Sequence, residues 1–157
     1  MNPKEPFKFL DAYAKEDADI FFGRDAEIEE LYSRVFYSKL LLVYGQSGVG
    51  KTSVIQCGLA NRLGEADALP IFIRHNGDLL QSLTRELNKF AMTPLPASSP
   101  EQESAAFVQA VRSLYLDYFK PIFLIFDQFE ELFLFGASSE QQRFAAMLAA
   151  LSEASLE

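Results

Sequence analysis

Three short, mainly apolar runs stand out along the chain, the second of which ends in the charged Arg74. They lie at residues 40–44, 70–74 and 122–126. A run without polar alternation is typical of a strand that is covered on both faces, as in a parallel sheet. The pattern therefore predicts three buried parallel strands.

Between and around these runs, apolar residues recur every three or four positions, which predicts amphipathic helices. A loop is expected at residues 93–103, which contain three prolines. Alternation of strands and helices indicates right-handed crossovers and an α/β fold. The predicted helices are 25–35, with Asp25 as the expected N-cap, and 51–63, 79–91, 105–119 and 141–151.

The turn between the first predicted strand and the second predicted helix carries the strongest chemical signal. Its sequence fits the P-loop pattern Gly-x-x-x-x-Gly-Lys-Ser/Thr without a mismatch. Glycines let successive backbone N–H groups turn toward an anion, and the following helix start adds unpaired N–H groups. Lys51 would hold the β- and γ-phosphates, and the Thr52 hydroxyl would bind Mg²⁺. The predicted nucleotide-binding residues here are Gly45, Gln46, Ser47, Gly48, Val49, Gly50, Lys51, Thr52 and Ser53.

A second motif is the apolar run that ends at Asp127. This pattern is typical of a Walker B strand, whose carboxylate holds Mg²⁺ directly or through water. We therefore predict Thr52 and Asp127 as metal ligands, and Lys51, Asp127 and Glu130 as catalytic residues.

Three side chains are candidates for the group that activates the attacking water, and the sequence does not decide between them. Gln128 directly follows the Walker B aspartate, where many P-loop ATPases with an additional strand have a glutamate. Glutamine can orient water but cannot accept its proton. Glu130 or Glu131 could supply the carboxylate. Alternatively, both belong to the first turn of the next helix, where acidic residues favour the positive end of the helix dipole.

A third motif, Phe21-Phe22-Gly23-Arg24-Asp25, precedes the first predicted helix. Together with the P-loop and the string Asp-Gln-Phe-Glu-Glu-Leu-Phe from Asp127, it resembles the STAND NTPases of the novel-STAND type, over about residues 10 to 151. The resemblance implies a three-layer P-loop NTPase fold of the ASCE and AAA+ kind. It also implies that Phe22, Gly23 and Arg24 lie against the adenine of ATP or ADP. The alternative is a glycine turn followed by a solvated arginine.

The same resemblance implies a signalling or defence ATPase that works as a slow switch. Such proteins self-associate through the NTPase domain and carry a C-terminal sensor region, which we expect to be missing here. ATP is favoured over GTP, because Asn88-Lys89-Phe90-Ala91 lacks the aspartate that reads guanine. The alternative function is a nucleotide-stabilised interaction module without significant hydrolysis.

The motifs and the Leu-Glu pair at residues 156–157, which is often left by expression vectors, set expectations about domain boundaries. We expect residues 1–22 to be an irregular lead-in segment with solvated acidic residues, 23–155 to be a partial NTPase domain, and 156–157 to be a vector-derived tail. In the family strand order 5-1-4-3-2, a fourth strand would separate the first strand from the Walker B strand. Without it, we expect direct pairing of these two strands, an inserted segment, or strand exchange between molecules. Nucleotide binding would then be weak and hydrolysis slow or absent.

The composition of the chain argues against some classes of binding partner. The 14 basic and 22 acidic residues give a net charge of −8, which argues against nucleic acid or an anionic membrane. The longest apolar stretch, residues 122–135, contains Asp127, Glu130 and Glu131 and cannot span a bilayer. Cys57 is the single cysteine and cannot form an internal disulfide, which fits a reducing cytoplasm. His75, without a cluster of other ligands, is expected to be a polar loop residue.

Overall fold

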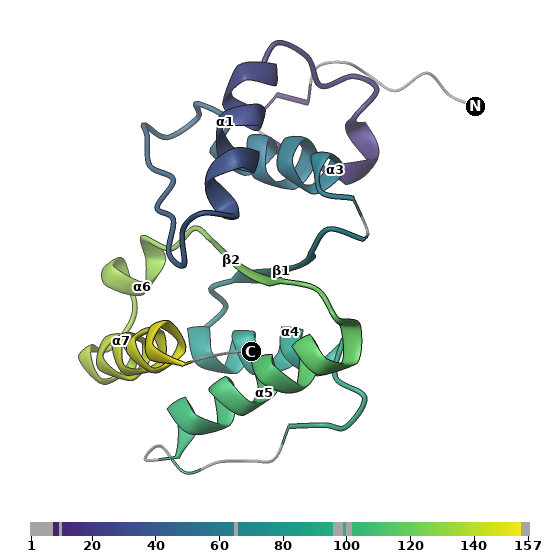
Figure 1. The fold of residues 1–157 in the computed structure, drawn as a ribbon. Coiled ribbons are helices and arrows are strands. Elements are labelled where there is room, and N and C mark those ends of the chain that lie inside the picture. Colours follow the sequence, from purple (N-terminus) through teal and green to yellow (C-terminus); the bar gives the residue numbers. More distant parts are fainter. Residues whose placement is uncertain (1–7, 10, 65, 96–98, 100–101, 155–157) are drawn as a thin grey trace. The chain divides into compact units, whose positions relative to one another are not determined.

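A computed structural model describes residues 8–9, 11–64, 66–95, 99 and 102–154 (Figure 1). The expected tail at 156–157 and parts of the expected lead-in and proline-rich loop lie outside the described residues. The chain divides into two compact units, Met1–Ala66 and Asp67–Glu157, which are described separately below.

The first unit consists of short helices. The 3₁₀ turn η1 is Lys15–Asp17 and the helix α1 is Asp25–Val35. Arg24, not Asp25, occupies the N-cap position of α1, so the predicted start is wrong by one residue. A continuous helical run then comprises α2 (Lys51–Ser53), the π-helical segment η2 (Val54–Leu59) and α3 (Ala60–Arg62). This run confirms the predicted helix after the P-loop. The periodicity of the sequence did not indicate that its middle part is a π-helix, which is wider than an α-helix.

Packing between α1 and η2 depends on the absence of a side chain at Gly58. A Cβ placed there would lie 2.5 Å from Cγ1 and 2.6 Å from Cδ1 of Ile28 on α1. Contacts below 3 Å are repulsive, so the glycine allows the two helices to approach closely. The buried thiol of Cys57 lies in the same helical segment.

We expect Gly58→Ala to lower the free energy of unfolding of the first unit by about 1 kcal/mol. Overpacking costs about 1–3 kcal/mol, and the better helix propensity of alanine offsets about 1 kcal/mol of this. Urea unfolding followed by circular dichroism measures the change. The double variant Gly58→Ala/Ile28→Ala removes the overlapping atoms, so the alanine at 58 should cost nothing measurable in that background. An equal cost in both backgrounds would show that the Ile28 contact is not the cause.

The predicted first strand, residues 40–44, is not formed. No strand is assigned there, and its side chains are largely exposed, with Leu40 at 73%, Leu42 at 71% and Tyr44 at 86%. Direct pairing of this segment with the Walker B strand, one of the three expected alternatives, is not observed, because in the sheet of the described residues the Walker B strand pairs with Leu69–Arg74. Strands persist only when their backbone N–H and C=O groups find partners, and this segment has no strand paired with it in the described part of the chain.

The second unit contains the other two predicted strands, both confirmed. β1 is Leu69–Arg74 and β2 is Ile122–Asp127; they pair in parallel, from Leu69 opposite Ile122 to Arg74 opposite Asp127. The three long helices of this unit lie on one side of the two strands, and a short helix follows the end of the second strand (Figure 1). They are α4 (Leu79–Asn88), α5 (Glu103–Tyr118), the short α6 (Glu131–Leu134) and α7 (Ser138–Glu153).

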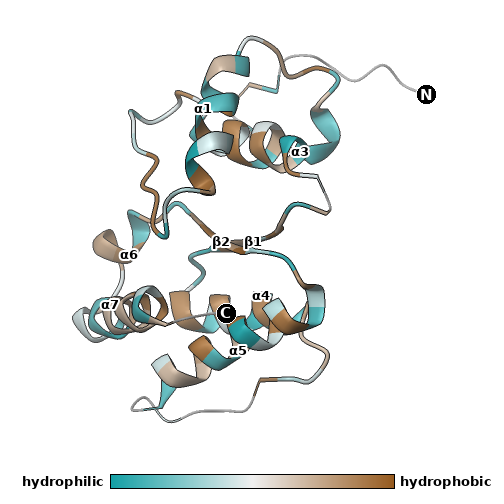
Figure 2. Cartoon of the chain, viewed as in Figure 1, coloured by the Kyte–Doolittle hydropathy of each residue, from teal (hydrophilic) through white to brown (hydrophobic). Residues whose placement is uncertain are grey.

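A hydrophobic core joins the strands to α4, α5 and α7 (Figure 2). Its fully buried members include Ile71 and Ile73 of β1, Leu83 of α4 and Leu114 of α5. The residues of β2 are all partly exposed. None of the helices in the described ranges is long and apolar enough to cross a membrane.

Charged side chains fix the start of α4 against α7. The carboxylate of Asp78 accepts a hydrogen bond from the backbone N–H of Gln81, 2.9 Å away, and Glu140 of α7 accepts one from the N–H of Leu79, 2.7 Å away. Arg143 of α7 donates to both oxygens of Glu103 at the start of α5, and these bonds raise the pKa of Arg143 above its usual value. Helices far apart in sequence are therefore joined at their ends by charge-assisted hydrogen bonds.

Candidate functional site

The P-loop adopts a conformation that two of its glycines make possible. Gly48 has φ +79° and Gly50 has φ +86°, in the left-handed region that other residues rarely adopt. Among the described residues, no atom outside its chain neighbours lies within 4 Å of the position of a Cβ on Gly48. The backbone on this side of the turn is therefore open to approach by another group.

Lys51 begins the helical run directly after this turn. Its Nζ atom donates hydrogen bonds to the carbonyl oxygens of Gly45, at 2.9 Å, and Gln46, at 3.0 Å. The ammonium group thus lies over the loop that precedes it. Because an ammonium group has three N–H donors, one more is available for an anion. Thr52 and Ser53 follow in α2, half-buried and buried respectively.

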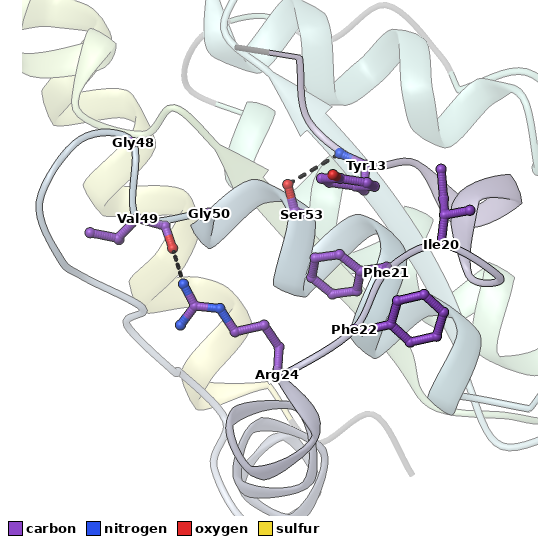
Figure 3. A pocket seen from close by; sticks show the side chains of 9 residues that line it. All are labelled: Tyr13, Ile20, Phe21, Phe22, Arg24, Gly48, Val49, Gly50 and Ser53. Atoms are coloured by element: carbon purple, nitrogen blue, oxygen red, sulfur yellow. Dashed lines mark hydrogen bonds between the residues drawn. The ribbon is translucent and has the colours of Figure 1, made fainter. Parts of the chain in front are cut away.

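A pocket of about 400 Å³ lies beside the P-loop within the first unit (Figure 3). It joins residues of the predicted P-loop to residues of the predicted Gly-Arg motif, which are far apart in sequence. The lining residues are Tyr13, Ile20, Phe21, Phe22, Arg24, Gly48, Val49, Gly50 and Ser53.

Arg24 connects the two motifs directly. Its Nη2 atom donates to the carbonyl oxygen of Val49 at 2.9 Å, as Figure 3 shows, and its Nη1 donates to Glu27 at 2.7 Å. The bond from Arg24 lowers the pKa of the Glu27 carboxyl below its usual value. Gly23, with φ +78°, provides the turn that precedes α1. Arg24 therefore connects the P-loop turn to the first turn of α1.

Three pocket residues, Tyr13, Ile20 and Phe21, belong to the lead-in segment that the sequence analysis left out of the site. The backbone N–H of Tyr13 donates to Oγ of Ser53 at 3.1 Å, and the rings of Tyr13 and Phe21 lie 5.2 Å apart. The aromatic residues just ahead of the Gly-Arg motif were the available signal, because large apolar side chains are seldom left in a purely solvated segment.

The expectation that the acidic residues of the lead-in are all solvated is wrong for Asp17. Only 5% of Asp17 is exposed, and its carboxylate accepts hydrogen bonds from Lys8 and from the backbone N–H of Ala14. The Asn61 side chain of α3 also donates to the carbonyl oxygen of Lys15 at 2.8 Å. The Asp17 carboxylate thus has its bonds satisfied within the segment, and the bond from Asn61 connects the segment to the helical run.

In the second unit, Asp127 ends β2 and lies opposite Arg74 of β1. The guanidinium of Arg74 bonds Oδ2 of Asp127 at 2.9 Å, and the backbone N–H of Gln128 donates to Oδ1 at 3.1 Å. Gln128 has φ +57°, so the chain turns sharply as the strand ends. This turn exposes the Gln128 side chain.

The three candidates for water activation differ in their surroundings. Glu130 is the N-cap residue of α6 and is exposed, whereas Glu131 is the first helical residue and is half-buried. Oε2 of Glu131 lies 3.8 Å from Nδ1 of His75. His75 lies in the loop directly after β1, as expected, but only 9% of its side chain is exposed, and its Nε2 lies 3.3 Å from Oε1 of buried Glu140.

Comparison with protein families gives one match: the model described as Novel STAND NTPase 1 matches residues 6–157. The chain belongs to this family. The comparisons with curated proteins and with solved structures found no match. The resemblance deduced from the three motifs is thereby confirmed, and the novel STAND NTPase has the α/β character expected of it, with a small parallel sheet.

The residues of this NTPase fit the nucleotide that the family name implies. The left-handed glycines leave room at the P-loop backbone, and Lys51 has a donor to spare. Thr52 of the first unit has a hydroxyl oxygen, a ligand type that Mg²⁺ accepts. In the second unit, the oxygens of Asp127 bond the Arg74 guanidinium and the backbone N–H of Gln128. In the described part of the chain no group of three or more His, Cys, Asp or Glu residues could hold a metal ion by itself.

Proposed function

We propose that this chain is the nucleotide-binding part of a molecular switch that binds ATP and ADP with Mg²⁺ and hydrolyses ATP slowly. The observation that carries the proposal is the pocket that joins the left-handed P-loop to the Gly-Arg motif. Family membership supports a nucleotide-binding role, and the family resemblance supports a cytoplasmic signalling or defence protein of greater length. We also propose the three-layer P-loop NTPase arrangement for the complete domain.

Different residues would bind the phosphates, the nucleobase and the Mg²⁺ ion of the nucleotide. The backbone N–H groups of residues 45–50 and the Lys51 ammonium bind the phosphates, because oriented amides and a nearby cation stabilise an anion. Phe22, Gly23 and Arg24 line the base, together with the aromatic side chains of Tyr13 and Phe21 in the same pocket. The Thr52 hydroxyl and Asp127 carboxylate hold Mg²⁺, which when bound would neutralise the phosphate oxygens.

Glu130 is the carboxylate that we propose to orient the attacking water and accept its proton. Its side chain is exposed next to the turn at Gln128, whereas Glu131 lies near His75 and is half-buried. Gln128 can orient water but has no proton-accepting group of suitable basicity.

A nucleotide-stabilised interaction module is the second candidate function. It is favoured by the exposed apolar side chains at 40–44, since clustered exposed apolar residues are typical of interaction sites. In this alternative, nucleotide binding controls self-association and hydrolysis is incidental.

Titration calorimetry with Mg-ATP, Mg-ADP and Mg-GTP tests the proposal. We expect saturable binding of both adenine nucleotides and at least tenfold weaker binding of GTP, because the chain lacks the guanine-reading Asn-Lys-x-Asp sequence. The absence of heat with all three nucleotides would contradict the proposed function. Equal affinity for ATP and GTP would contradict the assignment of adenine as the nucleobase that the pocket prefers.

Glu130→Gln separates the two candidate functions. In the full-length protein, we expect it to reduce ATP turnover by about 100-fold or more, in line with the usual contribution of a general base, while ATP binding is retained. Glu131→Gln is the matched control and should leave turnover within about twofold. Phosphate release at high protein concentration measures both variants. Unchanged turnover in Glu130→Gln would remove this residue from the mechanism, and wild-type turnover below detection would favour the interaction module.

A further inference from the structure

The guanidinium of Arg24 bonds a peptide group of the P-loop itself. Its Nη2 atom donates to the carbonyl oxygen of Val49 at 2.9 Å (Figure 3). Its Nη1 atom donates to Oε1 of Glu27, in the first turn of α1, at 2.7 Å. All three residues belong to the first unit. Glu27 therefore holds one side of the planar guanidinium and the P-loop carbonyl holds the other, which fixes the direction of the side chain.

The bonded carbonyl also sets the direction of the next N–H group. In a planar trans peptide, the C=O and the N–H that follows it point in opposite directions, and every peptide bond of the described residues is trans. Because the Val49 carbonyl points to Arg24, the Gly50 N–H points to the opposite side of the loop. Gly50 has φ +86°, a left-handed conformation of the kind that turns successive N–H groups toward an anion.

Glycine at position 50 makes this direction easy to lose. Without a Cβ, glycine adopts φ on either side of zero, so the peptide between residues 49 and 50 can rotate and turn its N–H away from a bound phosphate. To rotate, the Val49 carbonyl must leave the guanidinium. A Cβ on Gly50 would lie 4.0 Å from Nη2 of Arg24, so the guanidinium lies directly beside this residue. Arg24 therefore raises the fraction of chains whose Gly50 N–H is ready to bind an anion.

We infer that Arg24 is a positioning residue for phosphate binding, whose guanidinium holds the peptide of Val49 and Gly50 so that the Gly50 N–H faces the phosphates. The inference rests on the proposed function and adds to it, because the family resemblance gives the Gly-Arg motif a role at the adenine alone. The stem of Arg24 lines the pocket, whereas its charged head acts on the P-loop. The ligands that depend on this head are therefore polyphosphates, with or without a nucleobase.

The test compares Arg24→Met with the wild-type chain, since methionine keeps an apolar stem and removes the donors. With Mg²⁺ present, we expect Arg24→Met to bind tripolyphosphate and ATP about three- to tenfold more weakly, the factor that one ordinary hydrogen bond contributes. Adenosine should bind within about twofold of the wild type, because the stem is kept. Competition with a fluorescent ATP analogue measures the three affinities. Weaker adenosine binding with unchanged tripolyphosphate binding would place the role of Arg24 at the adenine and overturn the inference.

A second measurement follows the peptide directly, by NMR of the chain with isotope-labelled glycine. In the free protein, the Gly50 amide signal of Arg24→Met should differ from that of the wild type, because the peptide no longer has one fixed direction. Saturating tripolyphosphate should bring the two signals together, since the bound anion holds the N–H in the same direction in both proteins. An equal difference in the free and bound forms would reflect only the missing guanidinium and would overturn the inference.

Arg34→Met is the matched control. Arg34 lies on the same helix, is more exposed than Arg24 and pairs with Glu30, so its loss should change none of these measurements. Circular dichroism establishes that the variants are folded. If Arg24→Met is not, Arg24→Lys serves as the test, because it keeps the stem but not the planar fork and should show a smaller loss with the same selectivity for polyphosphates.

The possible results separate this inference from the proposed function. If the wild-type chain binds neither ATP nor tripolyphosphate, the proposed function is wrong and the inference falls with it. If the wild type binds both and Lys51→Ala binds neither, but Arg24→Met matches the wild type for tripolyphosphate, only the inference is overturned. A similar loss for tripolyphosphate and for adenosine also overturns it, because it indicates damage to the whole pocket.

Discussion

Lys51→Ala is expected to weaken ATP binding by about 100-fold or more, the largest effect on nucleotide binding among the substitutions proposed for this chain. In the structure the Lys51 ammonium is held over the P-loop by the carbonyl oxygens of Gly45 and Gln46. It is therefore already positioned where the proposed phosphates bind, and little side-chain ordering is needed on binding. Hydrogen bonds to charged groups contribute about 1.5–3 kcal/mol each, and every 1.4 kcal/mol changes affinity tenfold. Titration calorimetry with Mg-ATP measures the change.

Two further variants control this experiment. Lys89→Ala removes an exposed lysine that pairs with Glu86 on α4, and it should leave ATP affinity unchanged. Lys51→Arg keeps the charge but replaces a compact ammonium with a larger planar group, so we expect most of the affinity to be lost. ATP affinity in Lys51→Ala within threefold of the wild type would show that phosphate binding does not depend on this residue.

The parts of the site that follow from local sequence were predictable. The P-loop requires glycine at positions with left-handed backbone, and Gly48 and Gly50 have that conformation. The strands β1 and β2 were predicted within one residue at each end, because their apolar runs are bounded by Pro121 and by the charged Arg74 and Asp127. The family followed from three short motifs.

The features that depend on distant contacts were not predictable. Residues 40–44 are as apolar as β1, but apolarity alone does not create a strand without a partner for the backbone. Tyr13 lines the pocket, and its backbone N–H bonds Ser53, a residue 40 positions away in the sequence. No local sequence pattern indicates such a distant contact. Burial of His75 likewise depends on Glu140 of α7.

The backbone conformation of Gln128 is a further feature that the sequence did not predict. Its φ of +57° is uncommon for a residue with a side chain, and sequence patterns would place glycine or asparagine there. The turn directs the chain from Asp127 into α6, so the conformation serves the end of β2 rather than the preference of glutamine itself. Such a position is recognised only when the turn is seen with the strand it ends.

The stability of the second unit depends most on its core, and Leu83→Ala is expected to have the largest effect there. Leu83 of α4 is 0% exposed and belongs to the cluster that includes Ile71 and Ile73 of β1. Replacing a buried leucine by alanine removes apolar contacts and leaves a cavity, which costs about 2–5 kcal/mol. This is a large fraction of the 5–15 kcal/mol that stabilises a typical domain. Hydrogen exchange of the β1 and α4 amides measures the loss within this unit.

Leu116→Ala is the matched control, because Leu116 lies on α5 of the same unit but is more than half exposed. Its truncation should change the free energy of unfolding by no more than about 0.5 kcal/mol. Similar losses of protection in the two variants would show that α4 does not pack on β1 as described. A loss confined to Leu83→Ala would support the core on which the Arg74–Asp127 register depends, since β1 carries one partner of that pair and packs against α4.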